Sequence, residues 1–111
     1  VMVFFSTWCA ACMEEVPELI AFQQKYGTGG VDVVGVGIDQ PLHTLKRFVE
    51  DARVNYRVVV DADSKVADLY GVTGVPLVVA VDSAGTVRFI GHALPKDKEA
   101  LVRNLQPSGS R

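Results

Sequence analysis

The sequence has no apolar run near the roughly 20 residues that a membrane-spanning helix needs. It also lacks a basic excess, because 11 Lys and Arg stand against 13 Asp and Glu, and the two signs are interspersed. Nucleic-acid-binding proteins ordinarily carry a basic face, so the sequence predicts no nucleic-acid or membrane-surface partner. Residues 1–5 are apolar but too few for a signal-peptide core, and no basic residues precede them.

Cysteine is scarce, since the chain has only Cys9 and Cys12. A small domain held together by disulfides carries more cysteines, so an apolar core must supply the stability here. At 111 residues, 49% of them hydrophobic, the sequence predicts one ordinary globular domain. We expect that domain to cover residues 1–106 and a flexible polar tail to cover 107–111. The two cysteines are then free for redox or metal chemistry.

The hydrophobic pattern predicts strands that alternate with helices. The expected strands are 1–5, 31–38, 58–60, 77–81 and 86–90, and the expected helices are 10–26, 41–53, from 63 or 64 to 70, and from 95 onward. Residues 82–85 (DSAG) are a hairpin signal, so the last two strands are predicted to be antiparallel. The first two strands, joined through a helix, should be parallel.

The predicted fold class is therefore α/β, with a mixed central sheet flanked by helices. The expected strand order is 31–38, 1–5, 77–81, 86–90, and 58–60 can extend the sheet beside 31–38. Pro17 lies inside the first predicted helix and should kink it.

Cys9 and Cys12 stand where the strand 1–5 passes into the helix 10–26. If Cys9 caps that helix, its sulfur faces unpaired backbone N–H groups and the positive end of the helix dipole. Both favour the nucleophilic thiolate, and each unit by which the pKa falls corresponds to about 1.4 kcal/mol. Three residues span nearly one helical turn, so Cys12 can form a disulfide with Cys9. The spacing predicts thiol–disulfide exchange, and the positions predict the roles: Cys9, at the exposed end of the helix, attacks, and Cys12, one turn inside, resolves the mixed disulfide.

Two other uses of the cysteine pair remain open. The pair could be half of a structural zinc site, which needs two more ligands, but His43 and His92 lie on different elements without a paired spacing. Alternatively, both cysteines could be inert buried thiols. The strand before the motif and the helix after it favour redox chemistry. Both histidines are predicted to be ordinary surface or edge residues.

Residues 8–12 (WCAAC) resemble the WCxxC site of thioredoxin-like proteins, and 14–19 (EEVPEL) resemble the E-x-P-E-L stretch of the TlpA/ResA-like (DsbE/CcmG-type) branch. The likeness continues through 33–36, 59–61 and 70–76, so it covers nearly the whole chain. That branch contains bacterial extracytoplasmic thiol–disulfide oxidoreductases, including those of cytochrome c maturation. The resemblance implies a thioredoxin-like fold, a periplasmic or other extracytoplasmic location, and no cofactor beyond the cysteine pair.

The resemblance also implies that four further residues belong to the site. Val75–Pro76 matches the cis-proline loop that packs beside the cysteines and pairs with substrate backbone, although it could be a simple loop before a strand. Glu15 matches a glutamate that serves the buried cysteine as acid and base, and desolvation would raise its pKa toward neutrality. A surface carboxylate is the alternative for Glu15, as expected for Glu14. Trp8 either shields the thiolate and contacts substrate or simply packs.

Four features depart from the family pattern. Val3 stands where thioredoxin has a buried aspartate, and Leu77 stands where many members have threonine. Ala10–Ala11 replaces the usual Gly-Pro or Glu-Pro pair, so the reduction potential cannot be transferred from the family. The family's N-terminal β-hairpin does not precede residue 1, and we expect the chain to be part of a longer domain.

From these patterns we expect a monomeric, metal-free dithiol oxidoreductase that reduces protein disulfides and receives electrons from an upstream thiol donor. The resemblance favours the reducing direction, whereas a strongly lowered Cys9 pKa would make an oxidant. The alternative from another class is a redox-inert thioredoxin-fold module that binds a partner or handles a metal. A peroxiredoxin-type peroxidase is disfavoured because the P-x-x-x-T-x-x-C setting is absent.

Overall fold

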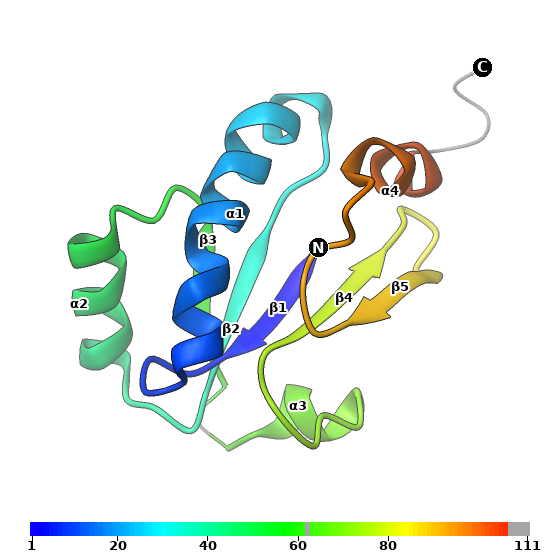
Figure 1. The fold of residues 1–111 in the computed structure, drawn as a ribbon. Helices are drawn as coiled ribbons and strands as arrows, with labels where there is room; N and C mark the ends of the chain where they lie inside the picture. Colours follow the sequence, from blue (N-terminus) through cyan, green and yellow to red (C-terminus); the bar gives the residue numbers. More distant parts are fainter. Residues whose placement is uncertain (62, 107–111) are drawn as a thin grey trace.

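Five strands form one mixed sheet in the order β3-β2-β1-β4-β5 (Figure 1). The structure is a computed structural model that describes residues 1–61 and 63–106. The strands are β1 Met2–Phe5, β2 Val34–Ile38, β3 Arg57–Asp61, β4 Leu77–Val81 and β5 Val87–Gly91. β1 pairs in parallel with β2, and β2 with β3, whereas β4 runs antiparallel to both β1 and β5. The predicted fold class and strand order are confirmed, including residues 58–60 beside the second strand.

Helices cover both faces of this sheet. They are α1 Ala10–Tyr26, α2 Leu42–Ala52, α3 Lys65–Leu69 and α4 Lys98–Leu105, with a short 3-10 helix, η1, at Gly27–Gly29. Successive side chains of β1 point to opposite faces. Val3 packs in a cluster with Leu19 of α1 and Leu101 of α4, whereas Phe4 packs with Ala67 of α3. α3 therefore lies on the face opposite to α1 and α4.

The structure differs from the prediction at the starts of two elements and at the cap of a third. The second strand begins at Val34 rather than at residue 31, and the N–H of Val33 donates to Gln23 Oε1 at 2.8 Å. The closing helix begins after Asp97, whose carboxylate accepts from the Ala100 N–H at 3.0 Å. Ser64 occupies the N-cap of α3, but its side chain makes no capping hydrogen bond. The predicted position of the N-cap is therefore confirmed at Ser64, but the side-chain capping hydrogen bond expected there is absent.

The cap of α3 comes from the end of β3 instead. The buried Asp61 carboxylate accepts from the Val66 N–H at 3.1 Å and from the Ala67 N–H at 2.9 Å. α3 has only five residues, and such a short helix depends on tertiary contacts to form. Asp61 thus holds the start of α3 against the end of β3.

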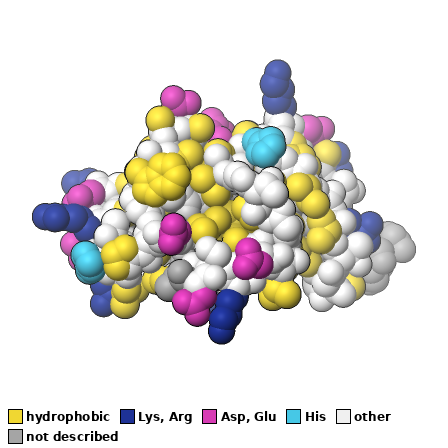
Figure 2. Space-filling model, turned by 90° about the horizontal axis from the view of Figure 1, so that it is seen from below, with side chains coloured by type: hydrophobic (Ala, Val, Ile, Leu, Met, Phe, Trp, Pro, Cys, Tyr) yellow, Lys and Arg dark blue, Asp and Glu magenta, His cyan; other side chains and the backbone are white. Residues whose placement is uncertain are grey.

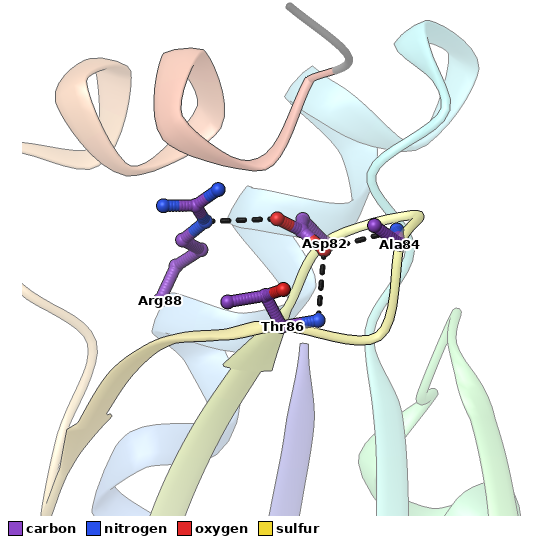
Figure 3. Close-up of polar contacts among 4 residues, drawn as sticks. All are labelled: Asp82, Ala84, Thr86 and Arg88. Carbon is purple, nitrogen blue, oxygen red and sulfur yellow. Dashed lines mark hydrogen bonds and ion pairs between the residues drawn. The ribbon is translucent and has the colours of Figure 1, made fainter.

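The hairpin between β4 and β5 is organised by one carboxylate (Figure 3). Asp82 Oδ1 accepts from the Ala84 and Thr86 N–H groups, both at 2.9 Å, and Oδ2 accepts from Arg88 Nε at 2.8 Å. The hydrogen bonds from Thr86 and Arg88 lower the pKa of Asp82. Gly85 has a φ of 86°, in the left-handed region that glycine enters easily. The predicted antiparallel hairpin is confirmed.

Two further sequence predictions concern Pro17 and the C-terminal tail. Pro17 lies in the interior of α1, as predicted. The predicted tail, 107–111, lies outside the described residues. Among the helices of the described ranges, none has the length and apolar character to cross a membrane.

Candidate active site

Cys9 caps α1, as the sequence predicts. It adopts an extended backbone, with φ −91° and ψ 111°, and its Sγ accepts a hydrogen bond from the Cys12 N–H at 3.2 Å. The sulfur therefore lies at the N-terminus of the helix. There, the unpaired backbone N–H groups and the positive end of the helix dipole both stabilise an anion. Both cysteines are free thiols; Cys9 is partly exposed and Cys12 is buried. This asymmetry separates an accessible sulfur from a protected one.

Cys12 lies in an apolar environment that suppresses its ionisation. It packs in a cluster with Phe5 and Leu45, and only 2% of its surface is exposed. Burial, together with the hydrogen bond to Cys9, raises the pKa of Cys12 to about 12. At neutral pH the buried cysteine is therefore a thiol, and it must lose a proton before it can act as a nucleophile.

The loop before β4 brings a distant segment to the reactive sulfur. The Val75–Pro76 peptide bond is cis, which confirms the conformation predicted for it. Cys9 Sγ donates to the Val75 carbonyl oxygen at 3.7 Å, across 66 positions of sequence. The Val75 side chain packs in the same cluster as the two cysteines, and Pro76 is buried. The predicted cysteine pair and the predicted proline loop are thus adjacent in space.

Glu15 projects toward the segment before α4. It is partly buried, and its Oε1 accepts from the Leu94 N–H at 2.8 Å. Within the described ranges, Glu15 makes no hydrogen bond to either sulfur. A carboxylate side chain is therefore fixed on α1 one turn beyond Cys12, while its role in proton transfer stays a prediction.

Trp8 offers an apolar surface next to the reactive cysteine. Its side chain is 75% exposed, so it does not pack into the core. Figure 2 shows the end of the molecule at which α1 begins and α3 lies: hydrophobic side chains and Asp or Glu side chains share its centre, and Lys and Arg lie toward its edge. Exposed apolar surface of this kind, bordered by polar groups, commonly marks a place where another molecule binds.

Sequence reasoning missed two contacts that shape this end of the sheet. The exposed His92 places its Nδ1 3.0 Å from the Pro76 carbonyl oxygen, so this histidine contacts the proline loop. Gln40, which is buried, exchanges two hydrogen bonds with Thr7. Gln40 follows β2 and Thr7 follows β1, and the carboxyl ends of parallel strands meet at one sheet edge. That rule could have indicated the Gln40 contact, whereas no sequence signal indicated the His92 contact.

Metal ligands do not gather in the described part of the chain. In residues 1–61 and 63–106, no group of three or more His, Cys, Asp or Glu side chains is placed to hold a metal ion. His43 is exposed on α2.

Comparisons with known proteins extend over almost the whole chain. The Redoxin family model matches residues 1–104. Thiol-disulfide oxidoreductase ResA of Bacillus thuringiensis (strain Al Hakam) is 27% identical over 106 residues, which cover 94% of this chain and 61% of that protein. ResA of Bacillus anthracis matches with the same identity and coverage. The chain thus spans about three fifths of the length of these curated relatives.

Solved structures share the same arrangement of strands and helices. A crystal structure described as a thiol:disulfide interchange protein DsbE of Chlorobium tepidum is 31% identical, with a TM-score of 0.78, over 92% of this chain and 73% of that one. A solution structure of a thioredoxin-like protein from Neisseria meningitidis has a TM-score of 0.83 at 21% identity, over 99% of this chain and 76% of that one, and shows the fold alone. Together with the geometry of the cysteine pair, these matches show that the chain belongs to the Redoxin family, as a thioredoxin-like protein of the TlpA/ResA type.

Proposed function

We propose that the chain is a thiol–disulfide oxidoreductase that reduces disulfides in other proteins. The observation that carries this proposal is the position of Cys9 Sγ at the start of α1, where it accepts the Cys12 N–H and lies beside the Val75 carbonyl. The partly exposed sulfur of Cys9 is the one that a substrate can reach, and the buried sulfur of Cys12 belongs to the next helical turn. The names of the ResA and DsbE relatives agree with this activity.

The reaction follows from the unequal burial of the two cysteines. The Cys9 thiolate attacks one sulfur of a substrate disulfide, forming a mixed disulfide and releasing the other substrate sulfur, which takes a proton. Cys12 then loses its proton and attacks Cys9 Sγ, so that the Cys9–Cys12 disulfide forms and the second substrate thiol leaves. Two electrons pass from the protein to the substrate; Cys12 gives up one of the two protons that the substrate gains, and solvent supplies the other, which it received when Cys9 ionised. A dithiol donor must then reduce the Cys9–Cys12 disulfide for another cycle.

We propose that Glu15 is the base that accepts the proton of Cys12. The high pKa of Cys12 means that its attack on the mixed disulfide requires a base. Glu15 follows Cys12 by three residues on α1, and residues with this spacing share a helix face, which supports the assignment. Its Oε1 is held by the Leu94 N–H, and within the described residues Oε2 has no hydrogen-bond partner. One oxygen can therefore anchor the carboxylate while the other takes the proton.

The substrate is proposed to bind across Trp8, Val75 and Pro76. Trp8 is exposed next to Cys9, and the cis-proline loop lies at the same sulfur. A substrate backbone that pairs with Val75 would bring its disulfide to Cys9. We further propose that the protein acts as a monomer in an extracytoplasmic compartment of a bacterium, without a cofactor, on substrates that include those of cytochrome c maturation.

The activity is tested by following insulin disulfide reduction with dithiothreitol as the donor. Wild type should accelerate the reaction, and Cys9→Ser should abolish the acceleration because no nucleophile remains. Cys12→Ser should accumulate a mixed disulfide, which mass spectrometry detects, because the resolving sulfur is missing. Ser83→Ala, at the exposed hairpin turn, is the control and should retain the wild-type rate. A Cys9→Ser variant as fast as wild type would overturn the proposal in favour of a redox-inert module.

The direction of electron flow is tested by the reduction potential of the Cys9–Cys12 pair in glutathione buffers. A value near thioredoxin's, about −270 mV, supports the reducing role. A value near about −120 mV, as in a strong oxidant, would contradict it.

A further inference from the structure

A small pocket lies beside the reactive sulfur, between the loop that follows β1 and the helix α3. Its volume is about 250 Å³, and Ser6, Trp8 and Val75 form the wall nearest to Cys9. The Val75 carbonyl oxygen is 3.7 Å from Cys9 Sγ, so the pocket begins next to the reacting atom. Pockets for whole small molecules measure about 300–1,000 Å³, and this one is better matched to a single side chain.

Ser6 supplies the pocket with an unsatisfied hydroxyl. Its side chain is 1% exposed, and among the described residues its Oγ has no hydrogen-bond partner. Phe4, two positions earlier on β1, faces Ala67 of α3, and side chains two apart on an extended chain share a face. Ser6, the residue after β1, is therefore expected on the same side of the chain, in agreement with its place among the residues that line the pocket. A buried hydroxyl without a partner costs free energy, which a ligand that supplies the partner recovers.

Two carboxylates also line the pocket. Asp39, after β2, and Asp68, on α3, both line it and are exposed. Within residues 1–61 and 63–106, neither carboxylate takes part in an ion pair. The described residues that line the pocket include no Lys or Arg. This charge distribution complements a cation and disfavours an acidic group.

We propose that this pocket binds the side chain of a lysine or arginine next to the reactive cysteine of the substrate protein. The inference rests on the proposed function, because it assigns the substrate's neighbouring residue to a subsite of the same reaction. The aliphatic stem lies against Val72 and Val75 at the pocket wall. The cationic head meets Asp39 and Asp68, donates an N–H to Ser6 Oγ and lies near the exposed Trp8 ring.

Two synthetic peptides test this subsite. Each contains one intramolecular disulfide, and they differ only in having Lys or Gln immediately before the first cysteine. The reduced protein is mixed with each peptide, samples are quenched in acid, and chromatography gives the rate constant of peptide reduction. Wild type should reduce the Lys peptide about fivefold faster than the Gln peptide at low salt, and this ratio should fall as salt is added.

Variants distinguish a local charge effect from a general one. The double variant Asp39→Asn/Asp68→Asn should bring the Lys-to-Gln rate ratio close to one. The double variant Glu50→Gln/Asp51→Asn removes the same net charge from exposed positions on α2 and should keep the wild-type ratio. Ser6→Ala should lower the ratio about twofold while raising the melting temperature, since it removes an unpaired buried hydroxyl. A purely structural role for Ser6 would leave the ratio as it is.

The outcomes separate this inference from the proposed function. If the wild type reduces neither peptide, the proposed function fails. If it reduces both at the same rate, or if the Asp39/Asp68 variant keeps the Lys preference, the basic subsite is refuted and the oxidoreductase stands. A loss of preference in the Glu50/Asp51 control would also refute the subsite, since the preference would then reflect net charge alone.

Discussion

Gln40 and Thr7 hold each other through two hydrogen bonds at the sheet edge that carries the cysteine pair. The Thr7 N–H donates to Gln40 Oε1 at 2.8 Å, and Gln40 Nε2 donates to Thr7 Oγ1 at 2.5 Å. Gln40 is only 8% exposed. Thr7 is two residues before Cys9, so a buried side chain of the neighbouring connection fixes the loop that leads into the reactive sulfur.

Gln40→Leu is expected to weaken both the fold and the reaction. It removes both hydrogen bonds and leaves the Thr7 N–H without this partner, which should lower the free energy of unfolding by about 1–3 kcal/mol. Thr7→Val removes only the bond from Gln40 Nε2 and should cost less. Urea unfolding measures these differences, and the rate of hydroxyethyl disulfide reduction should fall several-fold in Gln40→Leu because the Cys9 loop loosens.

Gln23→Leu is the matched control for Gln40. Gln23 Oε1 also accepts a backbone N–H, that of Val33, at 2.8 Å, but it lies on the far half of α1. The control should therefore lose stability without a comparable loss of rate. Equal loss of rate in the two variants would show that Gln40 acts through stability alone.

Glu15→Gln should slow the second step of the reaction and change its pH dependence. The amide oxygen can still accept from the Leu94 N–H, but the side chain can no longer take the Cys12 proton. General-base catalysis is typically worth a factor of about 10²–10⁴, so the mixed disulfide should persist at least tenfold longer at neutral pH. The deficit should shrink as pH rises toward the Cys12 pKa of about 12, because Cys12 then ionises without help.

The lifetime of the mixed disulfide is measured by acid quenching and mass spectrometry across the pH range. Glu14→Gln, at an exposed neighbouring position, is the control and should behave as wild type. If both variants changed the lifetime of the mixed disulfide by the same factor at every pH, Glu15 would have no specific role in the proton transfer.

Local sequence signals predicted much of this arrangement. The apolar runs located the strands; the helix crossover and the hairpin signal predicted which of them pair, and the position of Cys9 between strand and helix predicted its place as the cap of α1. The missed features depend on contacts between distant residues. The Gln40–Thr7 pair is 33 positions apart, and no local spacing indicates which polar side chain will be buried. The N–H groups at the start of α3 are capped by Asp61, the residue after the predicted strand 58–60, because the chain turns back over that carboxylate.

Asp61→Ala should detach α3 from the sheet edge. The change removes the acceptor for two N–H groups, those of Val66 and Ala67, and should lower the free energy of unfolding by about 2 kcal/mol. Hydrogen exchange at these two amides should accelerate, because a five-residue helix has little stability of its own. Asp63→Ala removes an exposed carboxylate whose contact with Lys65 is 3.8 Å, and this control should change stability little. Unchanged exchange in Asp61→Ala would refute the capping role.

Tyr56 should make the protein lose stability in alkaline solution. Burial raises the pKa of Tyr56 from 10.0 to about 12, so the folded state keeps the phenolic proton while the unfolded chain loses it. The contribution is fully present below pH 10 and is lost as pH rises toward 12, a total of about 3 kcal/mol. The pKa of Cys12 is also raised in the folded protein, so its ionisation lowers the stability over the same pH range. The comparison is therefore made in the Cys12→Ser background. Urea unfolding from pH 9 to 11.5 should show a shallower loss of stability in Tyr56→Phe, whereas Tyr70→Phe, at an exposed ring, should retain the steeper one. Equal slopes for the two variants would show that the Tyr56 phenol is not the group responsible.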